Sequence, residues 1–383
     1  MITPPVTPGP ANALVDVAGL RVGHHQSRTD GYLSGTTVLL APDGGMVAGV
    51  DVRGGGPGTR ETDLLSPTAS VERVHAIVLT GGSAYGLASA SGVADALGER
   101  GIGLQVGPQP DQVVPIVPSA VLFDLGRGGD FAARPDEAFG RAAVQAALEA
   151  DSEAMAACGC IGAGTGAVAG GLKGAVGGAS AVLPDGTIVA ALMVANAVGS
   201  TVDPHTGTLW GAPLLLPGDG PVLRAPAPAE RDALLAAATA PPGGPDRASA
   251  GHTMRNTTIG VLATDATLTK AQCTKLAAVG HDGLARAVNP IHTLFDGDTL
   301  FAVSSTGRPA PDVVGYQTIL AAAADVVTRA MVRAMLAAGG VQTAGGQWSS
   351  YLELAPSALV TAEGNASPGP DRAGGTNGKA VVQ

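Results

Sequence analysis

Residues 256–265 decide the fold and the function, and they read NTTIGVLATD. Before them, residues 216–252 are rich in Pro, Ala and Gly and predict an exposed connector. The stretch itself is mostly β-branched and aliphatic, which predicts a buried strand over 257–264. A threonine at the boundary between connector and strand becomes a new N-terminus if the peptide bond before it is broken.

Thr257 would then carry both groups that a nucleophile needs. A threonine hydroxyl reacts poorly unless a base lies within hydrogen-bond distance. A free α-amine, with a reference pKa of about 8, can be that base. The same hydroxyl can attack the carbonyl of Asn256 in the uncut chain, which predicts self-cleavage. Taken alone, the spacing also fits an ordinary strand threonine, which is the commoner case.

A pair of acids follows in residues 296–303, DGDTLFAV. Asp296 and Asp298 flank one glycine and lead into a predicted strand, so their side chains could point the same way. One carboxylate could hold the new ammonium group of Thr257, and the other its partner or the hydroxyl. An Asp-Gly turn before a strand is the common alternative.

Together with upstream segments, these motifs resemble one enzyme family. The upstream segments are GGSAYGL (81–87), VPSAVLFD (117–124) and VANAVG (194–199). The combination is similar to the self-processing aminopeptidases and amidases that include the D-aminopeptidase DmpA, the β-peptidyl aminopeptidases and the nylon-oligomer (6-aminohexanoate oligomer) hydrolases. The resemblance extends from about Gly19 to Gly340 and favours the functional interpretation of both motifs.

The resemblance implies a role for each matching residue. Thr257 would be the nucleophile, and Asn256 the last residue of the N-terminal fragment. Asn196 would donate an amide N–H to the oxyanion, an interaction typically worth about 3 kcal/mol in the transition state. Asp298 would orient the α-amine, with Asp296 beside it.

Two further residues follow from the resemblance. Lys173, in the segment GGLKG (170–174), matches an active-site lysine of the nylon-oligomer hydrolases, and Tyr85 resembles a pocket tyrosine. The aminopeptidase branches carry serine as nucleophile and serine at the first position of the acid pair. Thr257 and Asp296 replace them here, as in the nylon-oligomer hydrolases, so a strict N-terminal peptidase specificity does not follow.

The predicted fold class is α+β, because strands and helices follow one another without regular βαβ alternation. The resemblance implies a four-layer α/β/β/α sandwich of two antiparallel sheets, as in N-terminal-nucleophile hydrolases of the DmpA and ornithine acetyltransferase type. We expect one hydrolase domain over 1–361, cut into fragments 1–256 and 257–383, with a disordered tail over 362–383. Strands are expected within 15–52 and over 75–80, 187–195, 257–264 and 299–305, and helices over 84–97, from 135, and over 230–238, 269–287 and 311–338.

Composition limits the classes of partner. The net charge of −10 and the lack of a basic run argue against nucleic acid. The apolar stretch 319–338 contains three charged residues, and no apolar leader is apparent, so no membrane span is expected. The three cysteines predict small buried thiols in a reducing, cytoplasmic compartment. The 57 glycines predict close approach of backbones between layers.

The function expected is hydrolysis of short amine-bearing amides, peptides or esters, with 6-aminohexanoate oligomers as one possibility. No metal or cofactor is expected, and a homotetramer of processed pairs is implied by the resemblance. Two alternatives stay open: an acyltransferase of the ornithine acetyltransferase type, and an unprocessed binding protein. Ser83 lacks the second glycine of a nucleophile elbow, and the loop 53–60 is interpreted as a structural turn more readily than as an anion site.

Overall fold

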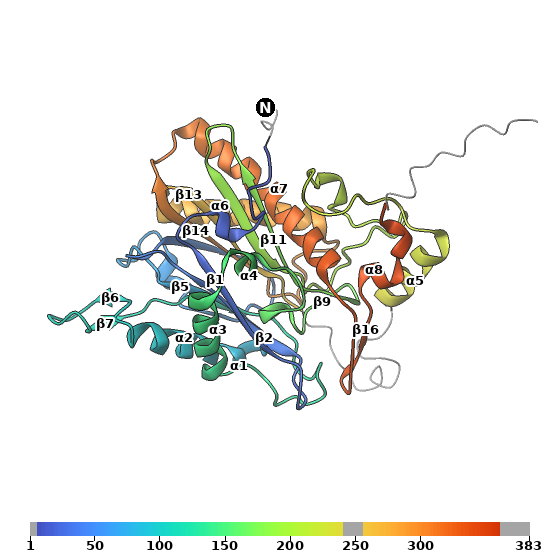
Figure 1. Cartoon of the computed structure of the whole chain (residues 1–383), viewed down its shortest axis with the longest axis horizontal. Coiled ribbons are helices and arrows are strands. Elements are labelled where there is room, and N and C mark those ends of the chain that lie inside the picture. The colour runs from blue at the N-terminus through green and yellow to red at the C-terminus, as the bar shows by residue number, and fades with distance from the viewer. Residues whose placement is uncertain (1–5, 240–255, 361–383) are drawn as a thin grey trace, which may run out of the picture.

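The structure is a computed structural model that describes residues 6–239 and 256–360. Two five-stranded sheets stack face to face, and helices cover the outer face of each (Figure 1). This is the predicted four-layer α/β/β/α sandwich. The proposed tail at 362–383 and residues 240–252 of the connector lie outside the described residues.

The first sheet has the strand order β1-β2-β5-β8-β4. Its outer face is covered by α2 and α3, where Val38 and Val78 pack with Val93 and Val144. The helix α3 begins after Asp136, whose carboxylate accepts from the N–H groups of the first turn. The elements are β1 (Arg21–Ser27), β2 (Ser34–Leu40), β4 (Thr59–Arg60), β5 (Ala76–Thr80), β8 (Ser119–Val121), α1 (Ser83–Gly86), α2 (Ala88–Gly98) and α3 (Glu137–Glu149).

The second sheet has the order β11-β12-β13-β14-β3. Strand β3, from the N-terminal part of the chain, crosses over to pair with β14. The outer face is covered by two long helices, α6 and α7 (Figure 1). The elements are β3 (Val47–Val52), β11 (Val176–Val182), β12 (Ile188–Val194), β13 (Ile259–Ala266), β14 (Thr299–Arg308), α6 (Lys270–Ala287) and α7 (Val313–Ala337).

The core between the sheets follows the two-residue alternation of a strand. In β5, Ile77 and Leu79 face the second sheet, while Val78 faces the helices. In β13, Ile259 and Val261 face the first sheet. The remaining elements connect these layers: α4 (Ser152–Ala156), α5 (Pro228–Thr239), α8 (Tyr351–Leu354), β6 (Leu104–Gln105), β7 (Val113–Val114), β9 (Val168–Ala169), β10 (Leu172–Lys173), β15 (Val341–Thr343), β16 (Gly346–Trp348), and five short 3-10 turns at 14–16, 63–65, 162–164, 212–214 and 356–358.

The prediction of close backbone approach is borne out in both halves. A Cβ on Gly23 of β1 would lie 2.2 Å from the Ala143 carbonyl oxygen of α3. A Cβ on Gly177 of β11 would lie equally close to the Ala330 carbonyl oxygen of α7, at 2.2 Å. One outer helix of each layer, α3 on β1 and α7 on β11, therefore lies directly on a strand backbone, which explains a core of Ala, Gly and Val with few aromatics.

Two expectations need correction. The sheets are mixed, because β5 pairs with β8, and β13 with β14, in parallel. Each parallel pair is joined by a crossover that contains a helix, which parallel strands require. The cysteines also differ from expectation: Cys273 is buried, whereas Cys158 and Cys160 are partly exposed, although all three are free. Within 6–239 and 256–360, no helix is long and apolar enough to cross a bilayer.

Candidate active site

The site forms at one end of the second sheet, where four chain segments meet. Strand β13 begins just after Thr257, and its antiparallel neighbour β12 ends just before Asn196. Its parallel neighbour β14 begins directly after Asp298. The next strand, β3, ends where the glycine-rich loop 53–58 begins. Sheet register therefore brings the predicted nucleophile, amide and acids together at the same end of the sheet.

Thr257 is buried, and its N–H and its hydroxyl have defined partners. Its N–H donates to the backbone oxygen of Asn196 over 2.8 Å. Its hydroxyl donates to the carbonyl oxygen of Asn256 over 2.5 Å, which is its one hydrogen bond among the described residues. The hydroxyl thus lies against the peptide bond predicted to be cut.

Asn196 lies beside Thr257, as expected, and is fully buried. Its Nδ2 donates to the Thr257 carbonyl oxygen over 3.3 Å and to the Phe123 oxygen over 3.5 Å. Its Oδ1 accepts from Arg127 and from the Val168 N–H. In the uncut chain the amide therefore faces the Thr257 carbonyl, and its role toward an oxyanion stays a prediction.

Arg127 is the site residue that sequence reasoning missed. Its guanidinium donates to Asn196 Oδ1 over 2.7 Å, to Asn256 Oδ1 over 2.6 Å and to the Gly166 oxygen over 2.6 Å. Burial lowers the pKa of this guanidinium to about 10, against the opposing effect of Asp124. A lone arginine in the segment GRGG (126–129), three residues beyond a quoted motif, is the signal that could have found it.

The acid pair lies on the other side of Thr257, and each carboxylate accepts from its own loop and from one neighbouring segment. Asp298 accepts from the Thr258 N–H over 2.7 Å and from the N–H and Nδ1 of His292, the latter at 2.8 Å. Asp296 accepts from the Val198 N–H over 3.0 Å and from the Thr293 hydroxyl over 2.5 Å. Neither contacts the Thr257 nitrogen, so their roles toward an α-amine stay predictions.

Burial raises the pKa of the Asp296 carboxyl, and the neighbouring Asp298 adds to that rise. The glycine-rich loop packs on the acid loop from outside. The N–H of Gly56 donates to the backbone oxygen of Asp296 over 2.8 Å, and the N–H of Arg53 donates to the backbone oxygen of Asp298 over 2.9 Å. A Cβ at Gly54 would lie 2.2 Å from the Asp298 nitrogen. Loop 53–58 is therefore a structural support for the acids.

Lys173 is buried below this site but does not contact Thr257. Its ammonium donates to the backbone oxygens of Gly164, Ala167 and Gly174 over 3.1, 2.9 and 2.5 Å. Burial lowers the pKa of Lys173 to about 8. Its strand β10 pairs with β9, whose Val168 N–H holds Asn196, so the lysine is linked to the site through that ribbon.

Tyr85 is not brought to Thr257 by any contact among the described residues. The residue is 55% exposed, and the guanidinium of Arg134 lies 3.9 Å from the centre of its ring. It lies on α1, at the end of the first sheet. The assignment of Tyr85 to a substrate pocket therefore stays a prediction without a supporting contact.

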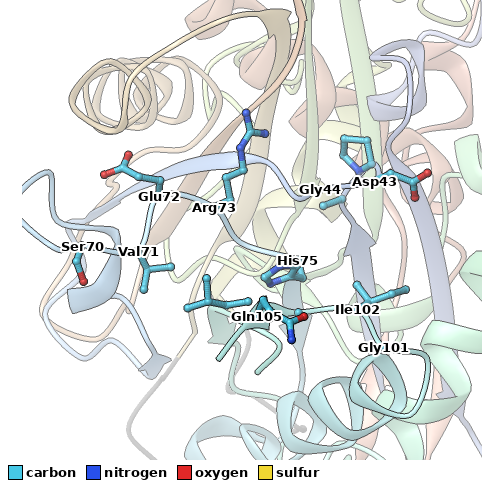
Figure 2. Close-up of a pocket in the computed structure, with 14 residues that line it drawn as sticks. Asp43, Gly44, Ser70, Val71, Glu72, Arg73, His75, Gly101, Ile102 and Gln105 are labelled. Atoms are coloured by element: carbon cyan, nitrogen blue, oxygen red, sulfur yellow. The ribbon is translucent and has the colours of Figure 1, made fainter. Parts of the chain in front are cut away.

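A cavity of about 590 Å³ lies elsewhere, between the β2–β3 turn and the β6–β7 hairpin. Figure 2 shows Arg73, His75 and Gln105 among its lining residues. None of the predicted site residues lines it. Burial lowers the pKa of His75, whose Nδ1 accepts from the Ile116 N–H. No cluster of metal-ligating side chains occurs in the part of the chain that the structure describes.

Known proteins share both sequence and fold with this chain. The profile of Peptidase family S58 matches residues 12–348. An uncharacterized aminopeptidase of Mycobacterium tuberculosis is 46% identical over 344 residues, 85% of this chain and 94% of the relative. A 6-aminohexanoate-oligomer endohydrolase of Paenarthrobacter ureafaciens is 32% identical over 326 residues, 82% of this chain and 84% of the relative.

Two solved structures show the same fold. A Burkholderia β-aminopeptidase superposes with a TM-score of 0.65 at 23% identity, over 94% of this chain and 97% of the other. The L-aminopeptidase D-Ala-esterase/amidase of Ochrobactrum anthropi, described as a variant of the Ntn hydrolase fold, gives 0.66 at 21% identity, over 94% and 98%. The chain therefore belongs to Peptidase family S58 and is an amidohydrolase of the aminopeptidase type.

Proposed function

We propose that the chain cuts itself between Asn256 and Thr257 and that Thr257 is then the nucleophile of an amide hydrolase. The observation that carries this proposal is the Thr257 hydroxyl lying 2.5 Å from the Asn256 carbonyl oxygen. Attack of Oγ1 on the carbonyl carbon forms a five-membered ring. Its collapse breaks the C–N bond, with a proton passing to nitrogen, and leaves an ester that water hydrolyses.

The two products would be an Asn256 carboxylate and a free Thr257 amine. That amine can accept the hydroxyl proton when Thr257 attacks a substrate carbonyl, and water then releases the acyl group. In this scheme Asn196 stabilises the oxyanion, while Asp298 and Asp296 fix the loop beside the amine. Lys173 acts through the ribbon behind Asn196, because its ammonium is held by three backbone oxygens.

The fragments 1–256 and 257–383 would stay together after the cut. Strands β13 and β14, from the second fragment, lie between β12 and β3, from the first. Separating the fragments would break two ladders and expose the core between the sheets. One processed pair therefore forms one domain.

The proposed substrates are short amides, peptides and esters, and the relatives extend this to 6-aminohexanoate oligomers. We further propose a cytoplasmic homotetramer. Its three free cysteines fit a reducing compartment. Leu294 and Phe295, 84% and 53% exposed beside the acid loop, are apolar surface that a neighbouring subunit could cover.

Denaturing intact mass spectrometry on fresh protein tests the proposal. We expect two fragments from the wild type, the smaller beginning at Thr257, and the same from Thr257→Ser, which keeps a hydroxyl. Thr257→Val keeps the shape without the hydroxyl and should stay whole, while the adjacent control Thr258→Val should be cut. A wild-type chain that stays whole on long incubation contradicts the mechanism, because no free α-amine forms.

A further inference from the structure

The side chain of Asn256 occupies a polar subsite of its own beside the nucleophile. Its Oδ1 accepts from Arg127 over 2.6 Å. Its Nδ2 donates to the Ala197 oxygen over 2.7 Å and to the Val168 oxygen over 3.3 Å. A guanidinium can only donate and a backbone carbonyl can only accept, so the partners fix which way the carboxamide points.

The walls of the subsite are the Arg127 guanidinium and the backbone oxygens of Val168 and Ala197. The subsite is rigid because further contacts hold each wall in place. Arg127 also binds Asn196 and the Gly166 oxygen, and its own backbone oxygen accepts from Thr343 of the β15–β16 hairpin. Val168 and Ala197 are buried, on β9 and after β12. The walls are therefore in place independently of what fills the subsite.

Self-cleavage and substrate turnover use the same nucleophile, so the acyl residue of a substrate takes the place of Asn256. The Asn256 backbone N–H also has a partner, the Phe295 oxygen, at 3.3 Å. The α-nitrogen of an acyl residue thus meets one acceptor, the Phe295 oxygen. Its side chain meets one cationic donor, Arg127, and two acceptors, the backbone oxygens of Val168 and Ala197.

Other side chains fit these walls less well. A carboxylate satisfies Arg127 but faces the oxygens of Ala197 and Val168. An ammonium satisfies those oxygens but lies against the guanidinium. An apolar side chain leaves the buried guanidinium without one of its acceptors, which is costly. A primary carboxamide satisfies both walls at once.

We propose that this acyl-side subsite selects a primary carboxamide, so that asparaginyl amides and esters are the preferred substrate class. The inference rests on the proposed function, because it takes Asn256 as the first acyl group that Thr257 attacks. Within that function it adds a specificity determinant, Arg127, whose guanidinium binds the side-chain oxygen of the acyl residue.

The first test changes the residue at position 256 and leaves Arg127, Val168 and Ala197 unchanged. Self-cleavage rates of wild type, Asn256→Asp, Asn256→Leu and Asn256→Lys are measured by intact mass against time. We expect each variant to cut about ten- to a hundredfold more slowly than wild type, from the loss of one charge-assisted hydrogen bond or its replacement by a repulsion. Melting curves of the same variants serve as the control for any loss of stability at the half-buried position 256. Variants cut as fast as wild type overturn the inference but leave the proposed function standing.

The second test uses 4-nitroanilides of Asn, Asp, Leu and Lys with processed wild-type enzyme. We expect the highest kcat/KM for Asn, by about tenfold or more. Arg127→Lys, which keeps the charge but loses the second donor arm, should reduce that preference, while Arg141→Lys on the exposed face of α3 should keep it. A flat panel, or a preference for Leu, overturns the inference. An uncut and inert wild type overturns the proposed function instead.

Discussion

Thr257 lies between two sets of polar side chains, the acid pair and Arg127, which differ in their hydrogen-bond partners. On one side the acids Asp296 and Asp298 accept almost entirely from backbone N–H groups and from neighbours in their own loop. On the other side Arg127 joins Asn196 to Asn256 across long stretches of chain. The first group holds a loop in shape, and the second holds Asn256, the residue before the proposed cleavage site. Stability should therefore depend on the acids, and reaction rate on the arginine.

The largest effect that would sharpen this contrast is expected from Asp298→Ala. The change leaves buried N–H groups of Thr258 and His292 without their acceptor, at a cost of about 3–5 kcal/mol in the free energy of unfolding. Chemical denaturation measures the loss. Asp51→Ala, which removes a half-exposed pair with Arg53, is the control and should cost less than about 1 kcal/mol. Equal losses for the two variants would break the contrast.

Arg127→Met should have the opposite effect: it should lower the rate of self-cleavage more than it lowers stability. Self-cleavage should slow by about a hundredfold, because Asn196 and Asn256 each lose a charge-assisted donor. Stability should change by only about 1–2 kcal/mol, since removing a buried cation also removes its desolvation cost. Cleavage time courses and denaturation on the same preparation separate the two quantities. A variant that unfolds readily but cuts at the normal rate would place Arg127 with the acids.

Thr293→Val tests how the acid loop affects the pKa of Asp296. The hydroxyl of Thr293 opposes the rise that burial gives to the pKa of Asp296, so the variant should raise that pKa further. A raised carboxyl pKa contributes stability at low pH that is lost as pH rises through it. The variant should therefore fall about 1–2 kcal/mol below wild type above the raised pKa, and less at low pH. Thr318→Val, on the exposed start of α7, should give no such pH-dependent gap.

Lys173→Met gives the smallest expected effect. With its pKa lowered to about 8, the buried lysine loses its proton earlier in the folded than in the unfolded chain. Its destabilising effect is full below pH 8 and is relieved as pH rises toward 10.5. Relative to the variant, wild type should gain about 1 kcal/mol between pH 8 and 9. A difference that is independent of pH would show that Lys173 keeps its ordinary pKa.

Local signals predicted most of the elements. The predicted helix at 269–287 is α6, which begins after Thr269 with a capping box to Gln272, and the strand at 75–80 is β5. The strand predicted at 257–264 begins two residues later, at Ile259, because Thr257 and Thr258 bond to Asn196 and Asp298 instead of to a ladder. Whether neighbouring strands are parallel or antiparallel could not be predicted from the sequence, because it depends on which distant strands pair with each other.

By itself, the sequence determined that a threonine follows a connector just before a buried strand, and that two acids separated by one glycine precede another strand. Those features are local, so residue spacing carries them. Only the tertiary structure decided that Arg127, 69 residues from Asn196 and 129 from Asn256, binds both. It likewise brought Asp298 to the Thr258 N–H, Asp296 to the Val198 N–H and Lys173 to backbone oxygens. The physical reason is that hydrogen-bond partners across such separations are set by sheet register, which brings the ends of β12, β13 and β14 to one edge.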